Sequence, residues 1–314
     1  MRKRKIGDRR DGYRLRGLDP YDTVSPYIMV ERNVSSNFFR DSIEMTNAEK
    51  FIKAQKEKGL TNFGLLHIFL AAYVRTVSQK PYLNRFISGQ KVFARNNIEI
   101  NMAVKPKFDR ESTDTVIKVH FDPSDTAKDV YNKFQSVYES AVSAAETSFD
   151  STAKIINYIP GLVKKFVVWL LKLLDYFGLL PNAILKVSPF HGSMFITSMG
   201  SLGIPPIYHH LYDFGNCPVF IAFGAPRHEY EITESGEVKR KKYVDFTVVT
   251  DERICDGFSY ASGLKAFRRL FTNPWILDKA PEKIVEDSNI DAKTSPKKLR
   301  KLEQKAAKKA AEQS

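Results

Sequence analysis

Apolar residues recur at helical spacing in four segments of the chain. The helices are predicted at about 46–59, 61–81, 124–141 and 257–271. In the first, Thr46 and Glu49 have the spacing of a capping box, and Gly59 is expected to end the helix. The second is apolar around most of its circumference, so it should be buried on several sides.

Other segments have the composition or the alternating pattern of strands. They cover residues 98–104, 115–121, 194–198, 218–223 and 243–250. The segment 115–121 alternates cleanly, with Ile117, Val119 and Phe121 on one face. Helices and strands are mixed without a regular βαβ alternation and without a glycine-rich phosphate loop. The predicted class is therefore α+β, not a doubly wound nucleotide-binding fold.

One further segment, 159–186, is rich in leucine and aromatic residues with lysines beside them, and Gly178 and Pro181 interrupt it. Its central charge-free run, 166–171, is far shorter than the roughly 18 residues that a membrane-spanning helix needs. Two interpretations remain open. The segment is an interfacial helix that makes a peripheral contact with an anionic membrane, or it packs over the body or into an oligomer contact.

The chain has 314 residues, of which 43% are apolar, and a formal charge of +13. Residues 1–20 carry +5 and residues 293–314 carry +6, so the 272 residues between them carry only +2. We expect a basic N-terminal tail (1–20), a folded body (21–277) and a basic tail (278–314) that is helical from Ser295 or disordered. Nucleic-acid binding is not favoured, because no recognised module is present and the aromatic residues lie in the body.

Two cysteines, Cys217 and Cys255, are too few for a disulfide framework and lack the spacing of a zinc site. We expect buried thiols in a reducing compartment and no metal. The basic N-terminus is not followed by an apolar run, so no export signal is predicted. A cytoplasmic location is therefore expected.

Three blocks of sequence occur in the order of a known family. Residues 251–257 read Asp-Glu-Arg-Ile-Cys-Asp-Gly, residues 194–200 read Met-Phe-Ile-Thr-Ser-Met-Gly, and 100–104 lead to the strand at 115–121. Together they resemble the catalytic domain of the dihydrolipoamide acyltransferases of 2-oxo-acid dehydrogenase complexes, and more distantly chloramphenicol acetyltransferase. The resemblance covers roughly residues 21–277. It implies a chloramphenicol acetyltransferase-like mixed sheet flanked by helices.

The resemblance also implies a chemistry and an assembly. In this family an acyl group moves from a thioester to a thiol or hydroxyl, a histidine deprotonates the acceptor, and a hydroxyl side chain stabilises the oxyanion. The site lies between subunits of a homotrimer. Thr197 occupies the position of the oxyanion hydroxyl, with Ser198 as the neighbouring alternative, and Asp256 matches the structural aspartate that holds the histidine loop through an ion pair.

The histidine position itself is occupied by Glu252. A carboxylate has an ordinary pKa of about 4.3 against about 8.5 for a thiol, so burial would have to raise the pKa of Glu252 for efficient base catalysis. Three hypotheses follow. The protein is a catalytically silent homologue acting as a trimeric scaffold or binding protein, Glu252 serves a different acceptor, or another histidine is the base.

The histidines nearest in sequence to the 194–198 strand are His191, His209 and His210, and His210 is the candidate base. We expect His67 and His120 to be structural and His228 to lie in a loop.

A second departure from the family is an insertion at about 145–190, where the family has a short connection. In addition, no lipoyl domain can be placed in this chain. The expected acyl donor is therefore acyl-CoA or an acyl donor protein acting in trans.

Overall fold

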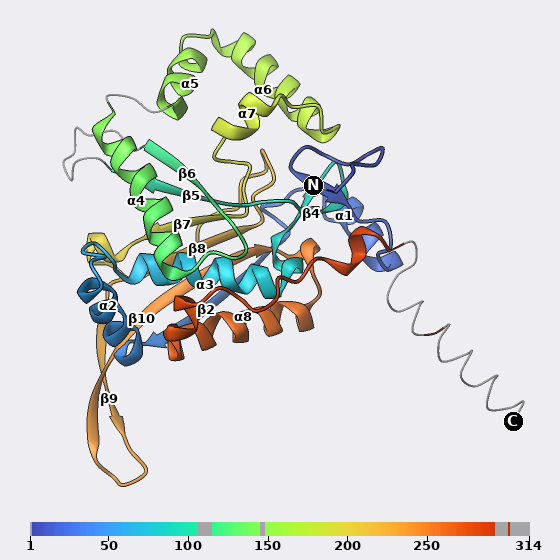
Figure 1. The fold of residues 1–314 in the computed structure, drawn as a ribbon. Coiled ribbons are helices and arrows are strands. Elements are labelled where there is room, and N and C mark those ends of the chain that lie inside the picture. The colour runs from blue at the N-terminus through green and yellow to red at the C-terminus, as the bar shows by residue number, and fades with distance from the viewer. Residues whose placement is uncertain (1, 106–114, 145–147, 293–300, 302–314) are drawn as a thin grey trace, which may run out of the picture.

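A mixed seven-stranded sheet forms the centre of the computed structural model, which describes residues 2–105, 115–144, 148–292 and 301 (Figure 1). Its order is β2 (Ser36–Glu44), β10 (Val238–Asp251), β8 (Val219–Phe223), β7 (Met194–Ser198), β5 (Ile98–Val104) and β6 (Thr115–Phe121). β9 (Arg227–Ile232) pairs with the first part of β10, and the two form a projecting ribbon. β7 runs parallel to β5 and β8, and the other pairs are antiparallel.

A second, three-stranded sheet has the order β1 (Gly12–Arg14), β4 (Lys91–Arg95) and β3 (Arg85–Ser88). Together with the helices, the two sheets confirm the α+β class predicted from the sequence.

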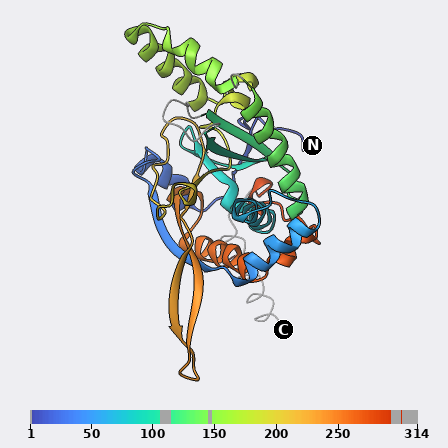
Figure 2. The same ribbon diagram turned by 90° about the vertical axis from the view of Figure 1, so that its left-hand side faces the viewer.

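The helices fall into two groups. α2 (Thr46–Glu57), α3 (Leu65–Gln79), α4 (Ala127–Ser143) and α8 (Gly257–Thr272) cover one face of the large sheet (Figure 2). α5 (Ser148–Asn157), α6 (Gly161–Tyr176) and α7 (Asn182–Val187) project beyond one end of the body, and α1 (Pro20–Ile28) precedes β2. Five 3₁₀ turns complete the described elements: η1 (Pro81–Asn84), η2 (Gly200–Leu202), η3 (Glu252–Ile254), η4 (Pro274–Asp278) and η5 (Ser288–Ile290).

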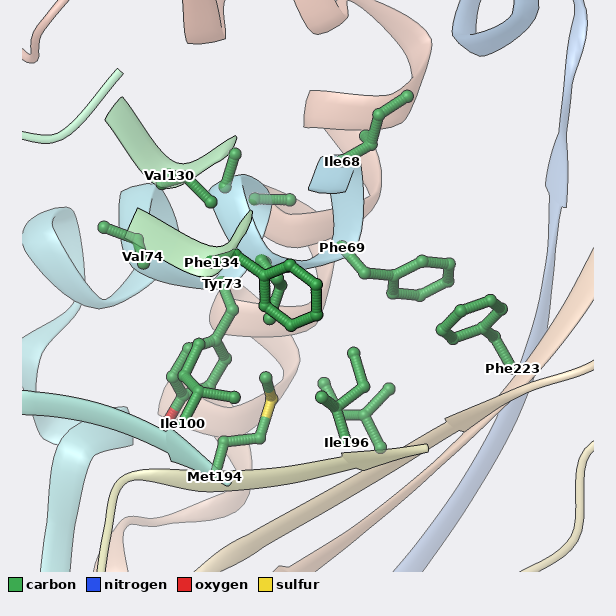
Figure 3. Close-up of a cluster of buried hydrophobic side chains, with 14 of the residues drawn as sticks. Ile68, Phe69, Tyr73, Val74, Ile100, Val130, Phe134, Met194, Ile196 and Phe223 are labelled. Atoms are coloured by element: carbon green, nitrogen blue, oxygen red, sulfur yellow. The ribbon is translucent and has the colours of Figure 1, made fainter. Parts of the chain in front are cut away.

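The main core lies between the sheet and α3, which is buried over most of its length as its composition predicts. Phe69 stacks on Phe223 with 4.6 Å between ring centroids (Figure 3). The Tyr73 hydroxyl donates to the Ser193 carbonyl at 3.0 Å, which satisfies the one polar group that this ring brings into the core.

The opposite face of the sheet is covered by the chain that links β7 to β8, residues 199–218. Phe195 and Phe220 pack there with Leu211 of this linker. The Thr247 hydroxyl donates to the Ile207 carbonyl at 2.7 Å, so the linker is held flat along the strands.

The N-terminal segment is tied into the body. Arg9 is buried and bonds Asp11 (Nε–Oδ1 2.9 Å) and Asp175 at the end of α6 (Nη2–Oδ1 2.7 Å). The Asn216 side chain donates to the second oxygen of Asp11 at 2.6 Å. This buried network connects β1, α6 and the linker.

Two local predictions are wrong. α2 begins at Thr46 itself, whose hydroxyl donates to Glu44, so Thr46 does not form the N-cap of a capping box. His228 lies in β9 instead of a loop, because the ribbon extends further than the sequence pattern indicates. Gly59 does follow the helix, with a positive φ of 94°. The helix expected from Ser295 falls outside the described residues.

Candidate active site

The two residues aligned with the family's reacting groups stand at opposite ends of the sheet. Thr197 pairs with Ala222, and Ala222 pairs with Thr247. Glu252 follows Thr247 by five residues and lies two strands away, which amounts to roughly 19 Å from strand geometry. A single chain therefore does not bring Thr197 and Glu252 together.

The side chains at the end of β7 point to different faces of the sheet. Residues alternate along a strand, so Thr197 shares the face of Phe195, beneath the β7–β8 linker. Ser198 lies on the helix-covered face. Only Thr197 can act from the linker side, which distinguishes the two hydroxyl candidates.

The turn that carries Glu252 is held by a buried ion pair. Arg253 binds both oxygens of Asp251 at 2.7 Å, and Arg32 approaches one of them at 3.3 Å. Arg253 also donates to the Met29 carbonyl at 2.6 Å. The backbone of η3 is consequently fixed from both sides.

Glu252 itself is exposed at the wall of a cavity of about 360 Å³. Its backbone N–H donates to the Ser35 carbonyl at 2.8 Å. The burial that a carboxylate base would need is not provided within one chain.

Asp256 lines the same cavity, and its Oδ1 accepts from the Ser259 N–H at 2.7 Å. It thereby caps α8, the helix that starts beside Glu252. Cys255 lies between Glu252 and Asp256 in the sequence, and burial raises the pKa of its thiol to about 12. Burial likewise raises the pKa of the Cys217 thiol. A raised pKa favours the protonated thiol, which is the less nucleophilic form.

His210 has an orienting partner. Its Nδ1 lies 3.0 Å from Oδ1 of Asn33, and the ring is exposed. An amide oxygen only accepts, so the contact is a hydrogen bond in the tautomer that carries the proton on Nδ1, and in that tautomer Nε2 offers a lone pair. The Asn33 N–H is in turn held by Asp213 at 2.9 Å. Asn33 and Ser35 belong to one short segment, so His210 and Glu252 are attached to the same piece of chain.

The remaining histidines are less suited to proton transfer. His209 is stacked on Phe220 at 4.3 Å, and burial lowers its pKa, with His210 adding to the effect. His191 is buried between Ser188 (Nδ1–Oγ 2.8 Å) and Asp175 (Nε2–Oδ1 3.3 Å). Its role is structural.

Sequence reasoning missed Asn33 and Arg32. Asn33 meets His210 across 177 residues of sequence, and Arg32 meets Asp251 across more than 200. The mostly polar segment 31–36, interrupted by Val34, was a weak local signal. In the described part of the chain, no group of three His, Cys, Asp or Glu side chains is placed to hold a metal ion.

Neither protein-family models nor curated proteins match the sequence. Solved structures do. A "probable dihydrolipoamide acetyltransferase" from Listeria monocytogenes superposes with a TM-score of 0.50 at 16% identity, over 79% of this chain and 91% of that chain.

The dihydrolipoamide acetyltransferase of Azotobacter vinelandii gives 0.49 at 14% identity, over 82% of this chain and 87% of its own. A chloramphenicol acetyltransferase gives 0.44 at 14%, over 80% and 94%. The fold expected from the sequence resemblance is confirmed by the Listeria structure.

Proposed function

We propose that the protein is an acyltransferase that moves an acyl group from a thioester donor to a thiol or hydroxyl acceptor. The shared fold supports this class of reaction, and one observation supports catalysis in particular. His210 is exposed, oriented by Asn33 and presents Nε2. This arrangement supplies an oriented imidazole, the side chain that most often serves as a general base, in a chain whose aligned position holds Glu252 in place of the family's histidine.

The proposed site forms between subunits of a homotrimer, as the family resemblance implies, and the wide separation of Thr197 and the Glu252 turn within one chain is consistent with such a shared site. Nε2 of His210 takes the acceptor proton as the acceptor sulfur or oxygen attacks the thioester carbonyl. The Thr197 hydroxyl of the neighbouring subunit donates to the oxyanion. Collapse breaks the carbon–sulfur bond, and the departing thiolate takes the proton from His210.

The donor is proposed to be acyl-CoA or an acylated carrier protein acting in trans, and the chemistry requires no metal. The body (21–277) would carry the reaction in the cytoplasm.

The first experiment measures thiol release from acetyl-CoA and longer acyl-CoAs. His210→Ala should lower kcat/KM by about 10²–10⁴-fold, the range for general base catalysis. Thr197→Ala should lower it by about 10²–10³-fold, while Thr197→Ser retains activity. His120→Ala, which removes an exposed histidine of β6, is the control and should be neutral.

Asn33 is a positioning residue, so its test is a pH profile. Asn33→Ala should lower the rate on the order of tenfold, because the ring loses its orienting partner. Asn33→Asp keeps an acceptor, restores the rate and moves the acidic limb of the profile to higher pH, because the added carboxylate stabilises the protonated imidazole. If Glu252→Ala abolishes activity while His210→Ala retains it, Glu252 is the base and our assignment is wrong.

Complementation tests the shared site. Co-expressed His210→Ala and Thr197→Ala chains should regain activity, because a mixed trimer contains sites with an intact histidine from one subunit and an intact threonine from the next. Two inactive variants that stay inactive together would exclude a site shared in this way.

The exposed Glu252 supports a second candidate, a catalytically silent trimeric scaffold. Inactivity of the wild type with every donor, together with activity gained by Glu252→His, would favour it.

A further inference from the structure

α6 turns an apolar face toward solvent. On this face the exposed apolar residues recur at helical spacing, and they are Leu162, Val163, Phe166, Trp169, Leu170, Leu173, Tyr176 and, directly after the helix, Phe177. With about 200 Å² for each fully exposed side chain, they expose roughly 850 Å². That exceeds the patch of a few hundred Å² found on ordinary monomers.

The other side of α6 faces the body and fixes the helix. Val167, Leu171 and Leu174 are partly buried, and Asp175 is buried against Arg9 and His191. Tyr176, at the border of the apolar face, is also tied to the body, because its hydroxyl donates to Gln90 at 2.8 Å. The apolar face is therefore held outward by contacts on the opposite side, at one end of the molecule (Figure 2).

Along one border of this face, lysines alternate with aromatic rings. Lys165, Trp169, Lys172 and Tyr176 follow at spacings of four, three and four residues, so they form one stripe. All four are exposed. From this border across the face, the lysine side chains come first, the amphipathic Trp and Tyr rings next, and the aliphatic side chains last. A lipid surface requires this order, because lysines contact anionic headgroups, Trp and Tyr rings lie at headgroup level and aliphatic chains lie deeper.

We propose that α6 docks the protein on the surface of a membrane containing anionic lipid. No described helix is long and apolar enough to cross a membrane, so the contact is with one leaflet surface. The N-terminal segment adds charge at the same end, since exposed Arg10 adjoins the Arg9 that binds Asp175.

A second copy of the chain is the competing occupant of this face. Pairing two α6 helices would bring the lysine stripe of each copy toward the other and remove it from water, at an electrostatic cost. Contact with an anionic surface carries no such electrostatic cost, because the lysines then face opposite charges. The charge border therefore favours lipid over a second copy, and this inference is independent of the proposed acyl transfer.

The test is co-flotation of the full chain with vesicles of phosphatidylcholine, with and without about one third phosphatidylglycerol. Wild type should bind the anionic vesicles at least tenfold better than the neutral ones. Phe166→Ser/Trp169→Ser and Lys165→Glu/Lys172→Glu should each lose at least tenfold. The control is Tyr230→Ser/Ile232→Ser, which removes two exposed apolar side chains from the distant β9 and should bind like wild type.

Fluorescence provides a second readout in the folded protein. The chain has two tryptophans, so Trp275→Phe leaves Trp169 as the only reporter. Its emission should move to shorter wavelength with anionic vesicles and stay unchanged with neutral ones.

Wild type that does not float, or α6 variants that float like wild type, would overturn the proposal. So would α6 variants with reduced oligomeric mass and unchanged vesicle binding, because the face would then be a contact between chains. Unchanged thiol release in the α6 variants would keep the two proposals separate.

Discussion

Asp251 offers the sharpest test of how this fold is held together. Its side chain is 0% exposed and that of its bidentate partner Arg253 is 1% exposed, with Arg32 close to the same carboxylate. Asp251→Asn keeps the shape but leaves two buried guanidinium groups without their counter-charge. Breaking a buried pair in this way costs about 3–5 kcal/mol of unfolding free energy. At about 2–4 °C per kcal/mol for a domain of this size class, the melting temperature should fall by roughly 6–20 °C.

The assay is urea unfolding at pH 7, read by circular dichroism, with thermal melts beside it. Asp245→Asn is the matched control, because Asp245 lies on the same strand and also meets two arginines, Arg227 and Arg40. Those partners are 39% and 55% exposed, so the loss should be only about 1 kcal/mol. Equal losses in the two variants would refute the reasoning that burial of the partners sets the cost.

Three further predictions concern stability. Burial holds the pKa of His67 at about 4, below its unfolded value of about 6.5. The unfolding free energy should therefore fall as the pH drops from 6.5 toward 4, by about 2 kcal/mol at pH 5. Urea titrations of His67→Asn should no longer show this loss. Gly215→Ala should lower the unfolding free energy by more than about 3 kcal/mol, because the new Cβ would lie 2.2 Å from a carbonyl oxygen and the backbone φ is 84°. Gly236→Ala has a similar φ of 80° but open space around it, so it should cost only about 1–2 kcal/mol. Similar melting temperatures for the two variants would contradict the steric argument. Thr126→Ala should cost about 1 kcal/mol in the same assay, because its hydroxyl accepts from the Asp129 N–H at the start of α4, and no measurable loss would count against this cap.

Helices and strands with strong periodicity were predictable, including the edge strand β6, but β2 at the other edge of the sheet was not. Among the described strands β2 pairs with β10 alone, and its apolar residues give no clean alternation. Phe39 and Ile43 share one face of the strand with Asp41 between them, while Phe38 on the other face is exposed. The hairpin of β3 and β4 turns at Gly89 and Gln90, both with positive φ. Gln at such a position is uncommon, so the usual Asn-Gly signal was missing.

The site was predictable only where its residues are close in sequence. Glu252 and Asp256 share one turn, so a local block located both. The pairing of His210 with Asn33 depends on how the linker folds back across the sheet, and no local pattern encodes it. The same holds for Arg9 and Asp175, which are 166 residues apart. The net charge of residues 1–20 predicted a basic tail that includes Arg9, because composition does not reveal which charged side chains are buried.

The pairing of β2 with β10 has a consequence for synthesis. Ser36 pairs with Asp251 and Glu44 with Tyr243, so β2 leaves the ribosome about 200 residues before its partner is complete. At a synthesis rate of about 5–20 residues per second, β2 remains without its partner strand for roughly 10–40 s. During that time its backbone groups and Phe38 are open to other nascent chains. The newly made protein should therefore depend on a chaperone during translation far more than the finished fold does afterwards.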